Sequence, residues 1–145
     1  MLKKTITYED YFGTIRTEDF YFNLSQTELS DMQMSVDGGF NNKLDQMIKA
    51  SDSREIYNTF VDIVLAAYGE VSPDGKYFIK KDENGNRLSD KFRQSLAYDA
   101  LMDEISKSEA TIAEFCNGII PKKIKEASQQ TQQQKPHGEY HPNNR

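Results

Sequence analysis

The chain contains no tryptophan, one cysteine and only two histidines. The single Cys116 excludes an internal disulfide and a multi-cysteine zinc site, and it is typical of a protein kept in a reducing cytoplasm. Both histidines, His137 and His141, lie near the C-terminus, so residues 1–120 lack the base of a Ser-His-Asp or Cys-His pair. The longest apolar run, Ile63–Tyr68, is far shorter than the roughly 20 residues of a membrane span. We therefore expect no membrane partner.

Positive charge is also scarce in most of the chain. Residues 1–120 hold 13 Lys and Arg against 21 Asp and Glu, residues 121–145 hold five against two, and the net charge is −5. An acidic surface repels phosphate backbones, so we expect no nucleic-acid partner.

The first ten residues include two lysines but no apolar stretch behind them, so we expect no signal peptide. The length of 145 residues, with eight tyrosines and eight phenylalanines, fits about one domain with one modest core.

The composition changes after residue 121. From Ser128 the sequence reads SQQTQQQKPHGEYHPNNR, with five glutamines between residues 129 and 134. These residues offer almost no apolar surface to offset the entropy of ordering, which is roughly 1–2 kcal/mol per residue for the backbone alone. The sequence therefore predicts one domain over residues 1–121 and a disordered Gln-rich tail over residues 122–145.

The first 24 residues have the pattern of an antiparallel hairpin. Polar and apolar residues alternate over Lys3–Tyr8, and the alternation resumes over Thr14–Leu24. Between the two segments, Glu9–Gly13 supplies a turn in which the glycine can adopt a positive φ. A hairpin in this register buries one face, and two strands alone are marginal in water, so helices must cover it. The residues of that face are Ile6, Tyr8, Phe20, Phe22 and Leu24.

Helical signals dominate the following residues. Ser25 and Glu28 form a capping box, in which each side chain accepts a hydrogen bond from the other residue's backbone amide. From Ile56 to Tyr68, apolar residues occupy two neighbouring helical faces. This pattern predicts a central helix over residues 54–68 that packs on two sides.

Weaker signals complete the expected architecture. Ser72–Gly75 is a turn and Lys76–Lys80 a short extended segment, and Asn117-Gly118 is expected to end the last helix. Apolar periodicity predicts three further helices, around residues 40–48, over 89–106 and from Ser108 onward. The sequence thus predicts an α+β fold: an N-terminal antiparallel β-hairpin packed on a bundle of about five α-helices, followed by the tail.

The sequence contains no complete metal-binding or phosphate-binding motif. His137 and His141 have the spacing of a helical zinc motif, but a glycine lies between them and prolines flank them. The segment from Gly69 to Lys76 is one residue too long for a phosphate-binding loop. Asp82–Arg87 begins like a calcium loop, but an arginine replaces the required glycine. We therefore expect no catalytic residue, no metal and no cofactor, and we expect that the protein is not an enzyme.

Several separated segments resemble one protein family. The opening MLKKTITYEDYFG and the following RTEDFYFNLS resemble the start of tail assembly chaperones of long-tailed, siphovirus-type phages of Gram-positive bacteria. Those proteins run from a Lys-rich ITY-type strand through a TEDFYFNL strand into an S-x-x-E helix. The resemblance covers roughly residues 1–121 and continues in the segments MSVDGG, AAYG, SPDGK, FIK and FCNGIIP.

The resemblance implies a morphogenesis factor rather than an enzyme. Such chaperones bind the tape measure protein, shield its apolar helical surface and recruit tail tube subunits, and they are absent from the finished particle. The resemblance also implies a homo-oligomer in the host bacterial cytoplasm. It further implies a longer form made by a programmed ribosomal frameshift, of which this chain is the short product.

Five residues are candidates for partner contact. Met32, Met34 and Met47 lie between the hairpin and the central helix, and methionine helps a surface accept varied partners. Ile119 and Ile120 are apolar at the edge of the expected order. The alternative for all five is a place in the core. Two other functions also remain open at this stage: a structural tail component of the virion, and a small phage protein that engages a host defence protein.

Overall fold

The computed structural model describes residues 1–32, 45, 49 and 53–121. The helix expected around residues 40–48, the candidates Met34 and Met47, and the predicted tail over 122–145 lie outside these residues. The described elements are β1 (Leu2–Glu9), β2 (Ile15–Phe22), α1 (Gln26–Asp31), α3 (Ser53–Ala67), β3 (Tyr68–Val71), β4 (Phe78–Ile79), α4 (Leu88–Phe92), α5 (Leu96–Ile105) and α6 (Glu109–Ile119).

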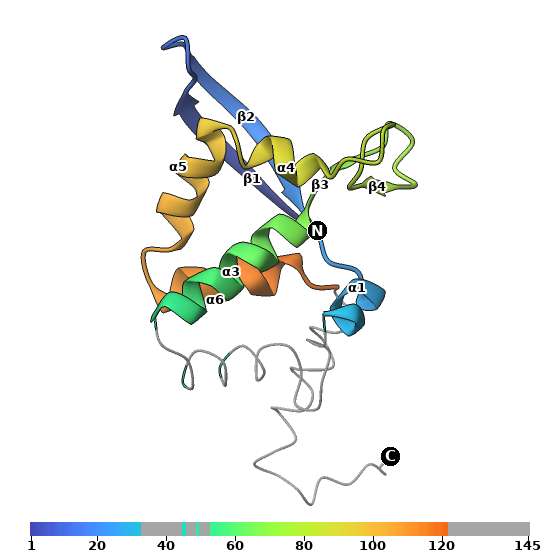
Figure 1. The fold of residues 1–145 in the computed structure, drawn as a ribbon, viewed down its shortest axis with the longest axis vertical. Helices are drawn as coiled ribbons and strands as arrows, with labels where there is room; N and C mark the ends of the chain where they lie inside the picture. Colours follow the sequence, from blue (N-terminus) through green and yellow to red (C-terminus); the bar gives the residue numbers. More distant parts are fainter. Residues whose placement is uncertain (33–44, 46–48, 50–52, 122–145) are drawn as a thin grey trace, which may run out of the picture.

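The predicted α+β class is confirmed, and the sheet is larger than expected. Four antiparallel strands follow the order β1-β2-β3-β4. β1 and β2 pair along their whole length, from Leu2 opposite Phe22 to Glu9 opposite Ile15. β3 pairs with β2 only at Tyr21 and Phe22. The far half of the β1–β2 hairpin therefore extends beyond the sheet as a two-stranded arm (Figure 1).

The predicted end of the central helix was one residue too long. α3 ends at Ala67, and Tyr68 is the first residue of β3. Gly69 permits this arrangement, because a Cβ there would lie 2.5 Å from the Phe78 ring and 2.7 Å from the Ile79 carbonyl oxygen. Helix α3 thus passes directly into β3, and the lack of a side chain at Gly69 lets β4 approach.

The single helix expected over residues 89–106 is two helices. α4 ends at Phe92, and α5 begins after its N-cap residue Ser95. The Ser95 hydroxyl donates to the Phe92 carbonyl at 2.7 Å and accepts from the Tyr98 amide at 3.3 Å. One serine therefore satisfies backbone groups on both sides of the break.

The last helix extends one residue past the predicted Asn117-Gly118 stop, to Ile119. Gly118 lies against the first strand, where a Cβ would be 3.2 Å from a methyl carbon of Leu2. The Leu24 amide donates to the Ile119 carbonyl at 2.8 Å. The end of α6 is thus packed against the first residues of β1 and against the segment that follows β2.

The core lies between the base of the hairpin and the helices. The predicted apolar face is confirmed, because Ile6, Phe22 and Leu24 are buried while Tyr8 and Phe20 are half-buried against the core. Rings from different elements meet around Phe22, whose centroid lies 5.3 Å from that of Phe115 and 6.0 Å from that of Phe92. This aromatic cluster anchors the base of the arm to the helical part of the domain.

Candidate functional site

The end of the hairpin arm presents apolar side chains to solvent. Tyr11 is 76% exposed, Phe12 95% and Ile15 66%. We call these three residues the hairpin tip. Large apolar groups gathered in this way on an exposed projection are typical of interaction sites rather than of core. The hairpin tip is the first candidate surface.

Asp10 shapes the turn that carries the hairpin tip. One of its carboxylate oxygens accepts hydrogen bonds from the amides of Phe12 and Thr14, each at 2.9 Å. The Gly13 amide donates to the Asp10 carbonyl at 2.9 Å, and Gly13 has a φ of 84°, which a glycine adopts without strain. The backbone under the aromatic side chains is therefore fixed by local hydrogen bonds.

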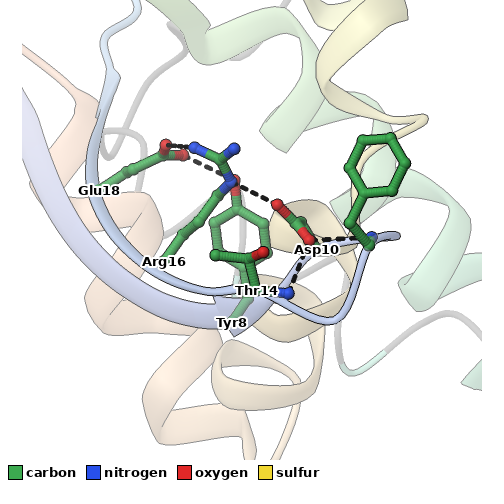
Figure 2. A network of polar contacts seen from close by, with 6 residues as sticks. Tyr8, Asp10, Thr14, Arg16 and Glu18 are labelled. Carbon is green, nitrogen blue, oxygen red and sulfur yellow. Dashed lines mark hydrogen bonds and ion pairs between the residues drawn. The ribbon is translucent and has the colours of Figure 1, made fainter.

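An ionic network braces the two strands below this turn (Figure 2). The Arg16 guanidinium donates through Nε to Asp10 at 2.6 Å and forms an ion pair with Glu18 at 3.4 Å. The Tyr8 hydroxyl donates to the other Glu18 carboxylate oxygen at 2.6 Å. The network crosses from strand to strand, so it holds the turn in one orientation relative to the arm.

The titration behaviour of this network follows from its hydrogen bonds. The bond from Arg16, followed by the amide of Thr14, holds the pKa of Asp10 below its usual value. The pKa of Arg16 is raised in turn by Asp10. The bond that Tyr8 donates to Glu18 raises the pKa of the phenol. Each of these three shifts favours the charge state that Asp10, Arg16 or Tyr8 ordinarily has at neutral pH.

A second candidate surface is a cleft of about 570 Å³ between α1, α3, α4 and the β3–β4 hairpin. Its apolar lining comprises Met32, Leu65, Ala66 and Tyr68. Tyr68 stacks on Phe92 with ring centroids 4.2 Å apart, which fixes this part of the wall. Burial raises the pKa of Tyr68 to about 12, so its hydroxyl stays neutral.

The charged lining of this cleft is mixed but contains more cations than anions. Its acids are Glu28, Asp62 and Asp90, and its bases are Lys80, Lys81, Arg87 and Arg93. Within residues 1–32 and 53–121, only Lys80 among these bases forms an ion pair. The exposed side chains of Lys81, Arg87 and Arg93 therefore offer cationic groups at the cleft.

Lys80 has a structural role in the cleft. Its ammonium donates to the carbonyls of Asn23 and Ala66, both at 2.8 Å, and to the Glu28 carboxylate at 2.6 Å. Burial lowers the pKa of Lys80, although the hydrogen bond to Glu28 opposes this effect. All three N–H groups of the ammonium donate hydrogen bonds, so Lys80 joins three chain segments. The other three cations of the cleft are exposed to solvent.

The candidates predicted from the sequence separate into three groups. Met32 is half-buried and lines the cleft. Met34 and Met47 lie outside the described residues. Ile119 and Ile120 are 0% and 3% exposed, so they belong to the core, which is the alternative that the sequence left open for them. The helix extends past Gly118 to Ile119, and Ile120 follows as a C-cap residue with extended backbone and a buried side chain.

The hairpin tip was not among the candidate surfaces predicted from the sequence. The signal was present, because Tyr11 and Phe12 stand side by side in a turn where small polar residues are usual. Arg87 and Arg93 had no such signal, since the cleft brings them together through tertiary structure. Cys116 is 0% exposed, and burial raises the pKa of its thiol to about 12.

A family model described as phage tail assembly chaperone matches residues 1–145. The chain belongs to this family, as its sequence segments suggested. No curated protein and no solved structure matches the chain. Across the described residues, none of the helices is both long and apolar enough to cross a membrane. Within those same residues, no three His, Cys, Asp or Glu side chains gather as a metal site.

Proposed function

We propose that this member of the family binds the tape measure protein of a long-tailed phage of Gram-positive bacteria and keeps it soluble in the host cytoplasm. In this proposal it also recruits tail tube subunits and leaves before the particle is complete. The family match supports the general role. The tape measure protein and the tube subunits are the partners that we assign to it.

The observation that carries the proposal is the exposed hairpin tip. A protein that holds an apolar helix in solution needs an accessible apolar surface of its own. Phe12 is 95% exposed and does not belong to the core of the described residues, whereas the turn beneath it is held by Asp10 and Arg16. A preorganised turn loses little conformational entropy on binding, so such a surface suits reversible capture.

We also propose that the protein acts without covalent chemistry. The only cysteine, Cys116, is buried and has a pKa raised to about 12, which disfavours the reactive thiolate. Both histidines lie in residues 122–145, away from the hairpin and helices in sequence. In this proposal a longer frameshifted form shares residues 1–121 and therefore presents the same hairpin tip.

Co-expression with the cognate tape measure protein tests the proposal. We expect the tape measure protein to stay in the soluble fraction and to co-purify with the wild-type chain. The double variant Tyr11→Ser, Phe12→Ser should lose most of this co-purification, because two exposed rings, each able to bury roughly 150–250 Å², are removed.

The matched control is Tyr77→Ser, which removes another ring that is 65% exposed, in the β3–β4 loop. This variant should retain binding. Equal loss in both variants would show that general surface apolarity, and not the hairpin tip, determines binding. A tape measure protein that is equally soluble without the chaperone would overturn the proposed function.

A further inference from the structure

Two like charges stand opposite each other at the cleft. Lys81 and Arg87 are partners in an isolated antiparallel β-bridge, and both are exposed and line the cleft. Side chains at directly opposite positions of such a bridge lie on the same face, where two like charges repel each other. Within the ranges 1–32 and 53–121, neither side chain forms an ion pair. The repulsion between them is therefore relieved best by an anion from outside this part of the chain.

The carboxylate next to Lys81 is already used by its own turn. One oxygen of Asp82 accepts hydrogen bonds from the amides of Asn84 and Asn86, each at 2.9 Å. These bonds hold the loop that brings Lys81 and Arg87 together. Asp82 thus positions the two cations and does not pair with them.

A buried hydroxyl without a partner lies beside these cations. Ser89 is 3% exposed and lines the same cleft, two residues after Arg87. Among the residues that the structure describes, none forms a hydrogen bond with the Ser89 hydroxyl. Buried polar groups are normally hydrogen-bonded, so an exception calls for a partner that the chain does not supply. A hydroxyl can donate to an oxyanion, and a guanidinium can do so as well.

The rest of the lining indicates what kind of anion fits. Met32 and Leu65 offer an apolar surface beside the cations, whereas Asp62 and Asp90 add two negative charges. These carboxylates repel a ligand with several negative charges, such as a nucleotide or a nucleic acid. A single carboxylate next to apolar side chains fits both parts of the lining. The cleft holds about 570 Å³, so a few side chains of a partner fill it.

We propose that the cleft is a second binding site, separate from the hairpin tip, for a segment of a partner protein that carries one carboxylate beside apolar side chains. The carboxylate accepts hydrogen bonds from Arg87, Arg93 and the Ser89 hydroxyl, and the apolar side chains lie on Met32 and Leu65. The hairpin tip contributes nothing to the lining of this cleft. One chain can therefore hold two partner segments at the same time.

A titration of the full-length, ¹⁵N-labelled protein with synthetic peptides tests this site. The probe is the end-blocked peptide Leu-Leu-Glu-Leu-Leu, and the matched control has Gln in place of Glu. The Glu peptide should shift the side-chain Nε–H signals of Arg87 and Arg93, and it should bind about tenfold more tightly than the Gln peptide, because hydrogen bonds to a charged group are the stronger ones. A Glu peptide that shifts neither signal, or equal affinities of the two peptides, would overturn the proposal.

Charge removal locates the site on the protein. The double variant Arg87→Gln, Arg93→Gln should weaken binding of the Glu peptide about fivefold or more, because two exposed ion pairs are lost. The control is Arg54→Gln, which removes an exposed guanidinium that lies in α3 outside the cleft lining. This control should bind the peptide as the wild type does. Equal weakening in both would show attraction by overall charge and would overturn the proposal.

Ser89→Ala separates binding from stability. The variant should bind the Glu peptide about two- to tenfold more weakly, the effect of one lost hydrogen bond. Its melting temperature should not fall, because the hydroxyl has no partner to lose within the described residues. Unchanged binding together with a lower melting temperature would show that Ser89 only supports the fold, and would overturn its assigned role.

Two further titrations distinguish other occupants. Inorganic phosphate that shifts the same signals as strongly as the Glu peptide would assign the cleft to a free anion and overturn the proposal. Cleft signals that move with protein concentration alone would assign it to a second copy, with the same consequence. The variant Tyr11→Ser, Phe12→Ser should bind the Glu peptide as the wild type does, so this site stands or falls independently of the proposed function.

Discussion

The two ends of the hairpin place the same residue type in opposite surroundings. Phe22, at the base, is 0% exposed and contacts the rings of Tyr68, Phe92 and Phe115. Phe12, at the other end, is 95% exposed. The base is held by aromatic packing and the other end by hydrogen bonds and ion pairs around Asp10. The same hairpin is therefore core at one end and interaction surface at the other.

The largest expected effect is the loss of the buried ring. Phe22→Ala should lower the free energy of unfolding by about 3–5 kcal/mol, because it leaves a cavity among three other rings. That is a large share of a small domain's stability of about 5–15 kcal/mol. Urea unfolding measures the change. Phe12→Ala is the matched control, and we expect its effect to stay within about 0.5 kcal/mol. Similar losses in both would contradict the distinction between the two ends.

A smaller loss is expected where the base of the hairpin meets Lys80. Lys80→Met keeps much of the apolar stem but removes the hydrogen bonds that Lys80 donates to the carbonyls of Asn23 and Ala66 and to one carboxylate oxygen of Glu28. Unmade hydrogen bonds at partly buried groups cost about 1–3 kcal/mol. We expect a value in the lower half of that range, because the Glu28 side chain is 37% exposed and partly screened by solvent.

The exposed Lys76 provides the comparison for this measurement, since its ammonium forms no hydrogen bond or ion pair with the residues that the structure describes. Lys76→Met should leave the denaturation midpoint almost unchanged. If it lowers the midpoint as much as Lys80→Met does, the loss of surface charge, and not the three hydrogen bonds of Lys80, determines stability.

The smallest effect is expected on acidification. Burial opposes ionisation of Glu28, but the hydrogen bonds from Lys80 and the Ser25 amide outweigh it and leave the pKa of Glu28 below its ordinary value of 4.5. The folded state therefore holds the carboxylate more strongly than the unfolded state does. This contribution is complete above pH 4.5 and is lost as pH falls through the lower folded pKa.

Unfolding of Glu28→Gln at several pH values measures this contribution. The difference in unfolding free energy between wild type and the variant should be largest above pH 4.5 and shrink below it. A difference for Glu28→Gln that stays constant down to pH 3 would contradict the assigned pKa direction.

The parts of the fold that the sequence predicted depend on local signals. Alternation placed Phe22 on the buried face of the hairpin, and the Ser25–Glu28 capping box began α1 as expected. Tyr68 was misassigned because a tyrosine fits a helical stripe and a strand equally well. The break at Ser95 was missed because apolar periodicity continues across it, so only the hydrogen bonds of the hydroxyl reveal two helices.

Surfaces were harder to predict than elements. Met32 lines the cleft, next to a short helix whose one buried residue is Leu29, and its contact with a partner stays a prediction. Ile119 and Ile120 were candidates for partner contact because the apolar pattern ends with them, with a place in the core as the alternative, and the structure buries both. Lys80 contacts residues up to 57 positions away, a relation that no local pattern contains.

The contact between the two ends of the domain also constrains the order in which it can form on the ribosome. Leu2 packs at Gly118, and the Leu24 amide requires the carbonyl of Ile119. The hairpin is synthesised first, but its covering helix α6 is among the last described segments to be translated. The nascent hairpin must therefore wait, with Phe22 still uncovered, until nearly the whole domain has left the exit tunnel. A ribosome that pauses before residue 119 holds a chain whose apolar face is still open to other proteins.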